Sequence, residues 1–199
     1  PDIPISVFSI QTKVYTIVLN IVTGIVLGGQ PIFGYNYGAK RMDRVREAYK
    51  IVFRATLITG ITATIIFQLW PKEVVGIFGS GNELYQEFAV KTFRIYLSLV
   101  TVTCLVKMTA VFFQSIGKSK YAVMASVIRD IVCFTPLAII LPSVLEGAEV
   151  GTGINGILYA APISDLVAIV VILILTISFF HKLNKETEVE VEKQEKLVV

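Results

Sequence analysis

Three ionisable side chains lie inside otherwise apolar runs of the sequence, and they are the first candidates for chemistry. They are Arg129, Asp130 and Asp165. A charge inside a membrane span costs about 2.5–3.5 kcal/mol on insertion scales, so each needs a partner, water or a route to the interface. If their runs are helices, Arg129 and Asp165 both lie roughly 12–15 Å inside them. We therefore expect an Arg129–Asp165 contact, which either pins two helices or lines a water-filled cavity. Asp130 then needs a partner of its own.

A second polar set lies in the first apolar run. Gln11, Asn20 and Gln30 follow one another at spacings of nine and ten residues, and we expect them near one helix face. They are interpreted either as helix-packing residues or as substrate contacts in the same cavity as the three ionisable residues. Gly24 and Gly28 are four residues apart, a spacing that predicts the close approach of another helix.

The other reactive side chains do not form a catalytic or metal-binding set. Cys104 and Cys133 lie inside apolar runs without Cys-x-x-Cys spacing, which is typical of small buried hydrophobic residues. His181, the single histidine, ends the last apolar run and is typical of a helix C-terminus at the interface. The sequence contains no nucleophile–base pair, phosphate-binding loop or nucleotide motif. We therefore expect neither an enzyme, nor a metal site, nor a cofactor.

The elements that hold these residues are predicted to be membrane-spanning helices. Hydrophobic residues make up 54% of the 199 and charged residues 17%, against about 25% charged in soluble domains, and the mean hydropathy is +0.72. Runs of about 20 apolar residues are long enough to span a bilayer. The predicted spans are residues 5–33, 51–70, 92–113, 121–145 and 157–180. The predicted fold is thus all-α: a polytopic bundle of about five transmembrane helices over residues 1–181, then a charged, solvated or disordered tail over 182–199.

The charges of the connections predict the orientation of the bundle. The first and third connections are basic, whereas the second and fourth are richer in Glu. Basic connections mark the cytoplasmic side, so we expect a multi-pass protein of the cell membrane with a cytoplasmic C-terminus and an external N-terminus. Since that orientation needs an odd number of earlier spans, and the opening residues lack a signal peptide, we expect the sequence to be a fragment. The net charge of +3 comes largely from connections and does not indicate nucleic-acid binding.

Two connections carry further local signals. Before the first basic connection stands QPIFGYNYGAK, residues Gln30–Lys40, in which a proline and two glycines surround aromatic residues. This composition predicts a loop made of Pro31, Gly34, Tyr35, Asn36, Tyr37 and Gly38. In the second connection, Asn82 is predicted to cap a helix that begins at Glu83. The apolar residues before it are expected along the membrane surface.

Three segments resemble the multidrug and toxic compound extrusion (MATE) family of transporters. Gln30–Lys40 is similar to the loop after that family's eighth span, Phe112–Pro142 to the junction of its tenth and eleventh spans, and Gly156–Val171 to the start of its twelfth. The resemblance implies that the chain covers spans eight to twelve of a transporter with two six-helix lobes.

The resemblance also implies an activity. It is the export of amphipathic organic cations in exchange for Na⁺ or H⁺, by a protein in contact with membrane lipid and with the N-terminal half of the same transporter. Some branches of the family have a coupling Asp in the tenth span, but residues 92–113 contain none, so that role is not carried over. The alternatives are a flippase for lipid-linked oligosaccharides, which would need a strongly cationic cavity, and a non-transporting remnant that only binds partners or lipid.

Overall fold

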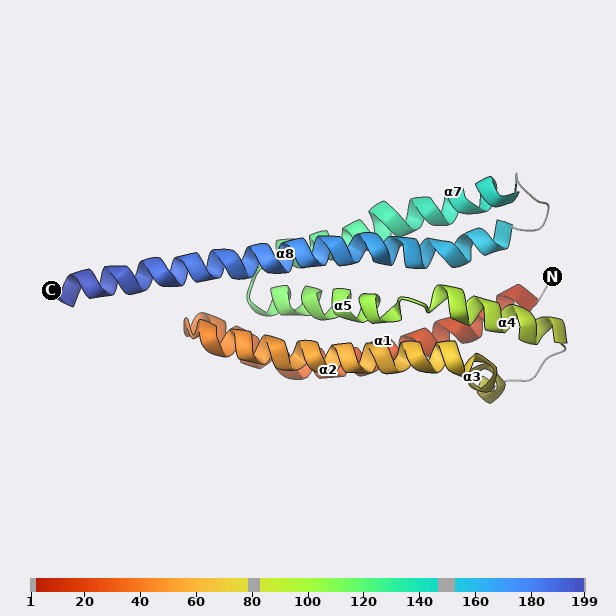
Figure 1. The fold of residues 1–199 in the computed structure, drawn as a ribbon, viewed down its shortest axis with the longest axis horizontal. Coiled ribbons are helices and arrows are strands. Elements are labelled where there is room, and N and C mark those ends of the chain that lie inside the picture. The colour runs from red at the N-terminus through yellow and green to blue at the C-terminus, as the bar shows by residue number, and fades with distance from the viewer. Residues whose placement is uncertain (1–2, 79–82, 147–152, 199) are drawn as a thin grey trace.

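The computed structural model is a bundle of long helices, as predicted (Figure 1). It describes residues 3–78, 83–146 and 153–198, and every regular element in these ranges is helical. The elements are α1 (Ile3–Gly38), α2 (Met42–Leu69), α3 (Pro71–Phe78), α4 (Glu83–Tyr96), α5 (Val100–Ser115), α6 (Ser119–Val127), the π-helix η1 (Ile128–Phe134), α7 (Thr135–Glu146) and α8 (Gly153–Val198).

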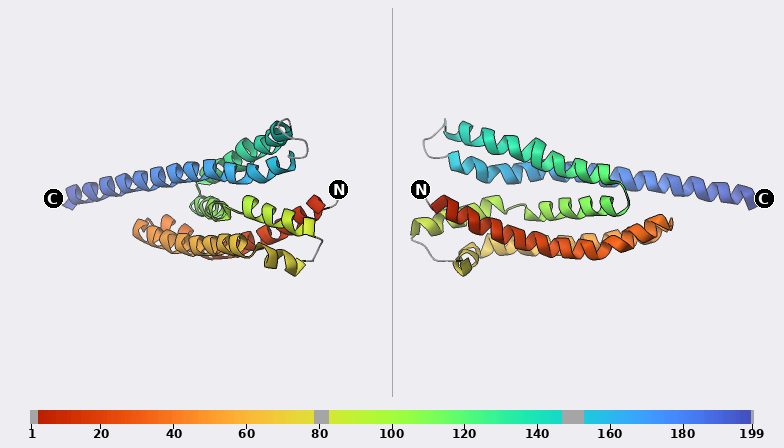
Figure 2. Two further views of the ribbon diagram at one scale, coloured as in Figure 1. Left: turned by 45° about the vertical axis from the view of Figure 1, so that its right-hand side comes forward. Right: turned by 180° about the vertical axis from the view of Figure 1, so that it is seen from behind.

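The long helices run back and forth along one axis. The α1–α2 and α5–α6 connections lie at the end of the bundle from which α8 extends, whereas α1, α4 and α8 begin at the other end (Figures 1 and 2). The two basic connections therefore share one end, as the charge pattern requires. Which end faces the cytoplasm stays a prediction.

The number of candidate spans agrees with the prediction. Four helical stretches of the described chain are long and apolar enough to cross a membrane, and α4 with α5 makes a fifth if that bent pair is one span. The helices meet at 45°, so the span predicted over residues 92–113 is broken. The span predicted over 121–145 consists of α6, η1 and α7.

The predicted loop at Pro31–Gly38 is wrong, because these residues form the last turns of α1. The chain turns only at residues 39–41, where Lys40 has a φ of 57° and the N–H groups of Lys40 and Arg41 donate to the carbonyls of Tyr37 and Asn36. That pattern is a Schellman motif. Pro31 removes one helical hydrogen bond, whereas a loop at membrane depth would leave several backbone groups without partners.

The tail is helical and not disordered, because α8 continues to Val198. Residues 182–198 are rich in Glu and Lys, which are good helix formers. They extend a helix that already exists, so the unfavourable nucleation step is absent.

In the second connection, α4 begins at Glu83 as predicted, and Asn82 lies outside the described residues. The short helix α3 places Ile77 on its exposed side. Val75, in contrast, is buried in the core rather than spread along a surface.

Helix α5 forms the centre of the bundle. Eleven of its sixteen residues are buried, and it packs against α1, α2, α6 and α8. Near its end, the ring of Phe112 lies 5.1 Å from that of Phe33 on α1, 4.7 Å from Tyr49 on α2 and 6.0 Å from Phe180 on α8. This aromatic contact ties four helices together at the end that holds the basic connections.

Close helix contacts occur at other glycines than expected. A Cβ atom placed on Gly24 or Gly28 would have no neighbour within 4 Å, so no helix of the described chain makes the close approach predicted for this pair. At Gly60 a Cβ would lie 2.9 Å from Thr101 Cα, and at Gly156 it would lie 2.6 Å from the carbonyl carbon of Leu141. Spacing permits a close approach, but the side of the helix that faces a neighbour decides where it occurs.

Candidate functional site

The predicted ion pair between the last two spans is present. Arg129 lies on η1 and Asp165 on α8, with 2.8 Å between the guanidinium Nε and the carboxylate Oδ1. The Asp165 side chain is 2% exposed and that of Arg129 13%. Asp130, which is 56% exposed, also pairs with Arg129 through Nη1. One guanidinium thus serves both carboxylates, and their two environments differ sharply in exposure.

Thr103 on α5 is the third partner of this pair. Arg129 Nη2 donates to its hydroxyl oxygen over 3.1 Å, and the hydroxyl donates to Asp165 Oδ2 over 3.1 Å. A hydroxyl can donate once and accept at the same time, so both bonds are compatible. The three side chains therefore connect η1, α5 and α8 through buried polar contacts.

The π-helical segment η1 determines where Arg129 and Asp130 lie along this span. The backbone N–H of Thr135 donates to the carbonyl of Asp130, five residues earlier, and the Thr135 hydroxyl donates to the same oxygen over 2.8 Å. Pro136 follows directly and has no N–H to continue the regular ladder. Widened turns of this kind are frequent at functional sites.

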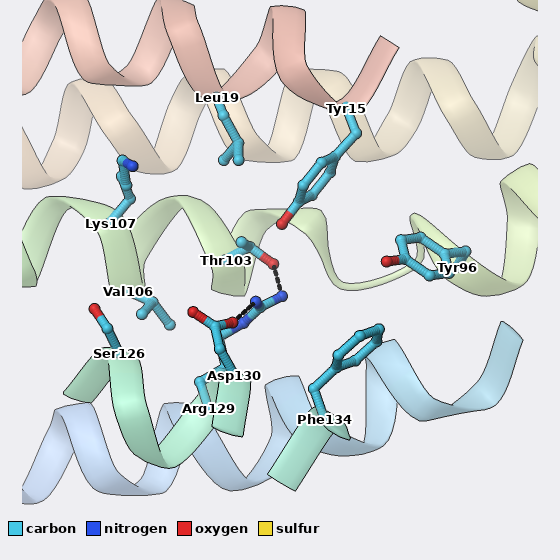
Figure 3. Close-up of a pocket in the computed structure, with 10 residues that line it drawn as sticks. All are labelled: Tyr15, Leu19, Tyr96, Thr103, Val106, Lys107, Ser126, Arg129, Asp130 and Phe134. Atoms are coloured by element: carbon cyan, nitrogen blue, oxygen red, sulfur yellow. Dashed lines mark hydrogen bonds and ion pairs between the residues drawn. The ribbon is translucent and has the colours of Figure 1, made fainter. Parts of the chain in front are cut away.

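Next to Arg129 lies a cavity of about 350 Å³ between α1, α5 and the α6–η1 segment (Figure 3). Its lining consists of Tyr15, Leu19, Tyr96, Thr103, Val106, Lys107, Ser126, Arg129, Asp130 and Phe134. The hydroxyl of Tyr15 points from α1 toward Thr103 and Arg129, and its ring lies edge-on to Tyr96 with 6.4 Å between the centroids. The cavity thus has aromatic walls and a polar floor.

The charges at this cavity are unequally compensated. Arg129 and Asp130 pair with each other at its edge, and Asp165 is buried behind Arg129. Lys107 lines the cavity from α5 and has no ion pair within the described part of the chain. The cavity can therefore receive a polar or charged ligand, or exchange an ion or proton at the exposed Asp130 carboxylate. Within the same residues, no three His, Cys, Asp or Glu side chains lie together as metal ligands would.

The polar residues of the first span do not join this site. Gln11 is buried beside Tyr96, Asn20 is exposed and Gln30 is half-buried, and none of them lines the cavity. The expectation of one common face is wrong, because nine residues of an α-helix make two and a half turns. Gln11 and Asn20 therefore point to opposite sides of α1.

Eight of the ten lining residues were absent from the sequence-based set, among them Tyr15, Tyr96, Thr103 and Lys107. Thr103 and Lys107 are four residues apart, so they share a helix face. A threonine and a lysine on one helix face, inside an apolar run, are a signal from which the sequence could have predicted that both residues line a polar site. The two tyrosines gave none, because their place at the cavity depends on how α1 and α4 pack against α5.

Comparisons with known proteins identify the family. The MatE family model matches residues 1–140. The chain belongs to the MATE family. The comparison with curated proteins found no match.

Solved structures agree with the MATE assignment. The structure of the MATE multidrug transporter DinF-BH in complex with rhodamine 6G is 29% identical, with a TM-score of 0.73, over 85% of this chain and 36% of that one. An inward-facing structure of a multidrug resistance MATE transporter is 16% identical, with a TM-score of 0.76, over 90% of this chain and 40% of that one. The chain therefore spans well under half of these transporters, and it is a multi-pass membrane protein with a MATE fold.

Proposed function

We propose that this chain works as part of a secondary active transporter that exports organic cations while Na⁺ or H⁺ moves inward. The observation that carries the proposal is the match of residues 1–140 to the MATE family. The similarity at 29% identity to a MATE multidrug transporter in complex with rhodamine 6G supports a cargo of that kind. The remaining part of the transporter, on this proposal, is supplied by the longer protein to which the chain belongs.

Two further comparisons support a mechanism in which this part moves as one body. The chain has TM-scores of 0.76 and 0.77 to inward-facing and outward-facing structures of a MATE transporter, and each match covers 90% of this chain. Because one structure fits both states about equally well, we propose that this part keeps its fold in both. Alternating access then comes from movement against a second body.

The cavity beside Arg129 is the proposed place of ion and substrate contact in this part. Asp130 offers an exposed carboxylate to it, and Arg129 links Asp130 to Asp165. A cation that binds Asp130 competes with the guanidinium of Arg129 for the same carboxylate. Ion binding and the contacts between η1, α5 and α8 are therefore coupled through one side chain, which is what exchange of two ligands requires.

The proposal is tested with the full-length protein in sealed vesicles. We expect efflux of ethidium or rhodamine 6G while a Na⁺ or H⁺ gradient exists, and no requirement for ATP. Asp130→Asn should lower gradient-driven efflux about tenfold, a typical coupling. Asp43→Asn is the matched control, because Asp43 is an exposed acid in the first turn of α2, away from the cavity. Residues 1–199 alone should move no dye, because alternating access needs two bodies.

Dye efflux that survives collapse of both gradients and stops on ATP depletion would refute the antiport mechanism. If Asp43→Asn impaired efflux as much as Asp130→Asn does, the cavity would not be the place where ion binding and substrate transport are coupled.

A further inference from the structure

A smaller cavity of about 140 Å³ lies at the end of the bundle that holds the basic connections. Tyr37 from the end of α1, Lys118 and Tyr121 from the α5–α6 turn, and Ser178, Phe179 and Lys182 from α8 form its walls. It is separate from the cavity beside Arg129, with which it shares no lining residue. Three segments that are distant in the sequence therefore build one site.

Aromatic contacts fix the walls of this basic cavity. The ring of Tyr37 lies 6.5 Å from that of Phe179, and Tyr121 stacks on Phe113 at 5.3 Å. Phe113 in turn meets Phe179 edge-on at 5.4 Å. The backbone is fixed as well, because Gly117 has a φ of 73° and the N–H of Lys118 donates to the carbonyl of Phe113 over 2.8 Å. The cavity is preorganised rather than formed by mobile surface chains.

The charge of the basic cavity is positive. Lys118 and Lys182 are both exposed, neither has an ion pair among the described residues, and the lining contains no Asp or Glu. Tyr37, Tyr121 and Ser178 add hydroxyl groups. Two ammonium groups and three hydroxyl groups around one cavity suit a phosphate, because hydrogen bonds from charged donors to phosphate oxygens are among the stronger ones.

The level of the basic cavity along the membrane-spanning helices points to a lipid as its ligand. The apolar run of α8 ends at Phe180, and His181 and Lys182 follow it directly. The basic cavity therefore lies where the hydrocarbon gives way to the headgroups. Tyrosines and lysines are typical of that level, and basic residues there attract anionic lipids.

An exposed apolar row continues from the cavity into the membrane. Ile174 lies one turn before Ser178 along α8, and Val170 lies one turn further. Their side chains are 59% and 54% exposed. A free phosphate would use only the cavity, whereas a phospholipid would use the cavity with its headgroup and this row with an acyl chain.

We propose that the basic cavity binds the headgroup of an anionic phospholipid, with the phosphate between Lys118 and Lys182. The bound lipid links the α5–α6 turn to α8 and the end of α1, and so stabilises this end of the bundle. The proposal does not depend on the transported substrate or on the coupling ion.

The test uses the full-length protein in phosphatidylcholine nanodiscs that contain a fluorescent phosphatidylglycerol. Lys118→Gln and Lys182→Gln should each weaken phosphatidylglycerol binding about fivefold, and their effects should multiply. The matched control is the pair Lys120→Gln and Lys72→Gln, which removes the same charge from exposed lysines outside the cavity. The control should bind as the wild type does. Lys118→Arg with Lys182→Arg keeps the charge and should retain most of the binding.

Three results would overturn the proposal. The first is equal loss in the control pair, which would indicate general surface charge. The second is unchanged binding after both lysines are replaced. The third is displacement of the lipid by inorganic phosphate at concentrations like those at which the lipid itself binds, which would identify a site for a soluble anion.

Discussion

At the scale of single residues, Arg129 holds together groups whose exposure differs sharply. Its bond to Asp165 is almost completely buried, whereas its bond to Asp130 reaches the cavity. Removing one partner of a buried pair leaves an uncompensated charge, but an exposed pair adds little to stability. The same guanidinium can therefore serve as a structural link on one side and an exchangeable partner on the other.

Substitutions at the buried pair should separate these two roles. We expect Arg129→Leu and Asp165→Leu each to lower the free energy of unfolding by about 3–5 kcal/mol. The double variant should recover part of that loss, because no buried charge is then left unpaired, and Asp130 is exposed to solvent. The measurement is denaturant unfolding of the purified full-length protein in detergent.

Asp130→Asn is the control for that series. It should change the free energy of unfolding by no more than about 1 kcal/mol, since Asp130 is exposed, although it should impair transport. Strictly additive losses in the Arg129 and Asp165 variants would show that the two side chains do not interact.

At the scale of helices, one glycine determines how α7 meets α8. The position of a Cβ on Gly156 lies 2.6 Å from the Leu141 carbonyl carbon and 2.8 Å from Pro142 Cα. These are backbone atoms, which cannot turn aside as a side chain can. Helices α7 and α8 can therefore pack this closely only because Gly156 has no side chain. The short distance between the two helices in turn places Asp165, further along α8, next to Arg129.

Gly156→Ala should force these two helices apart. We expect a loss of about 1–3 kcal/mol in the free energy of unfolding, typical of overpacking. Gly28→Ala is the matched control, since nothing lies within 4 Å of its Cβ position. It should be neutral or stabilise α1 by up to about 1 kcal/mol, as alanine is the better helix former. Thermal unfolding of both variants in the same detergent measures the difference, and equal effects would disprove the close contact.

At the scale of the whole molecule, the arrangement of helix ends matches the charges of the connections. The basic turns after α1 and α5 share one end with the extension of α8, and the beginnings of α4 and α8 share the other. Segregated lysine and arginine residues favour the cytoplasmic side for the first end. The same end contains the aromatic contact around Phe112 and the basic cavity.

The orientation can be checked by labelling. In a Cys104→Ser, Cys133→Ser background, single cysteines are placed at Ser119 and at Gly153, which begin α6 and α8 at opposite ends. A thiol reagent that does not cross membranes, added to intact cells, should react at position 153 and not at 119. Permeabilised cells provide the control, because both positions should then react. Equal labelling in intact cells would contradict the predicted orientation.

The sequence alone determined the class of the protein and how deep its most deeply placed charged residues lie within their spans. Apolar runs of bilayer length predicted the spans, because length and hydropathy are local properties of the chain. Equal depth within two runs was enough to predict the contact between Arg129 and Asp165, which the structure confirms.

Only the tertiary structure decided which side of each helix meets a neighbour. Gln11 is buried whereas Asn20 is exposed, Gly156 makes a close helix contact whereas Gly24 makes none within the described chain, and Thr103 joins the ion pair from α5. It also decided that α1 continues through Pro31 to Gly38. The rotation of a helix about its axis and the place where it ends depend on packing against segments distant in the chain. Local composition carries no record of those segments.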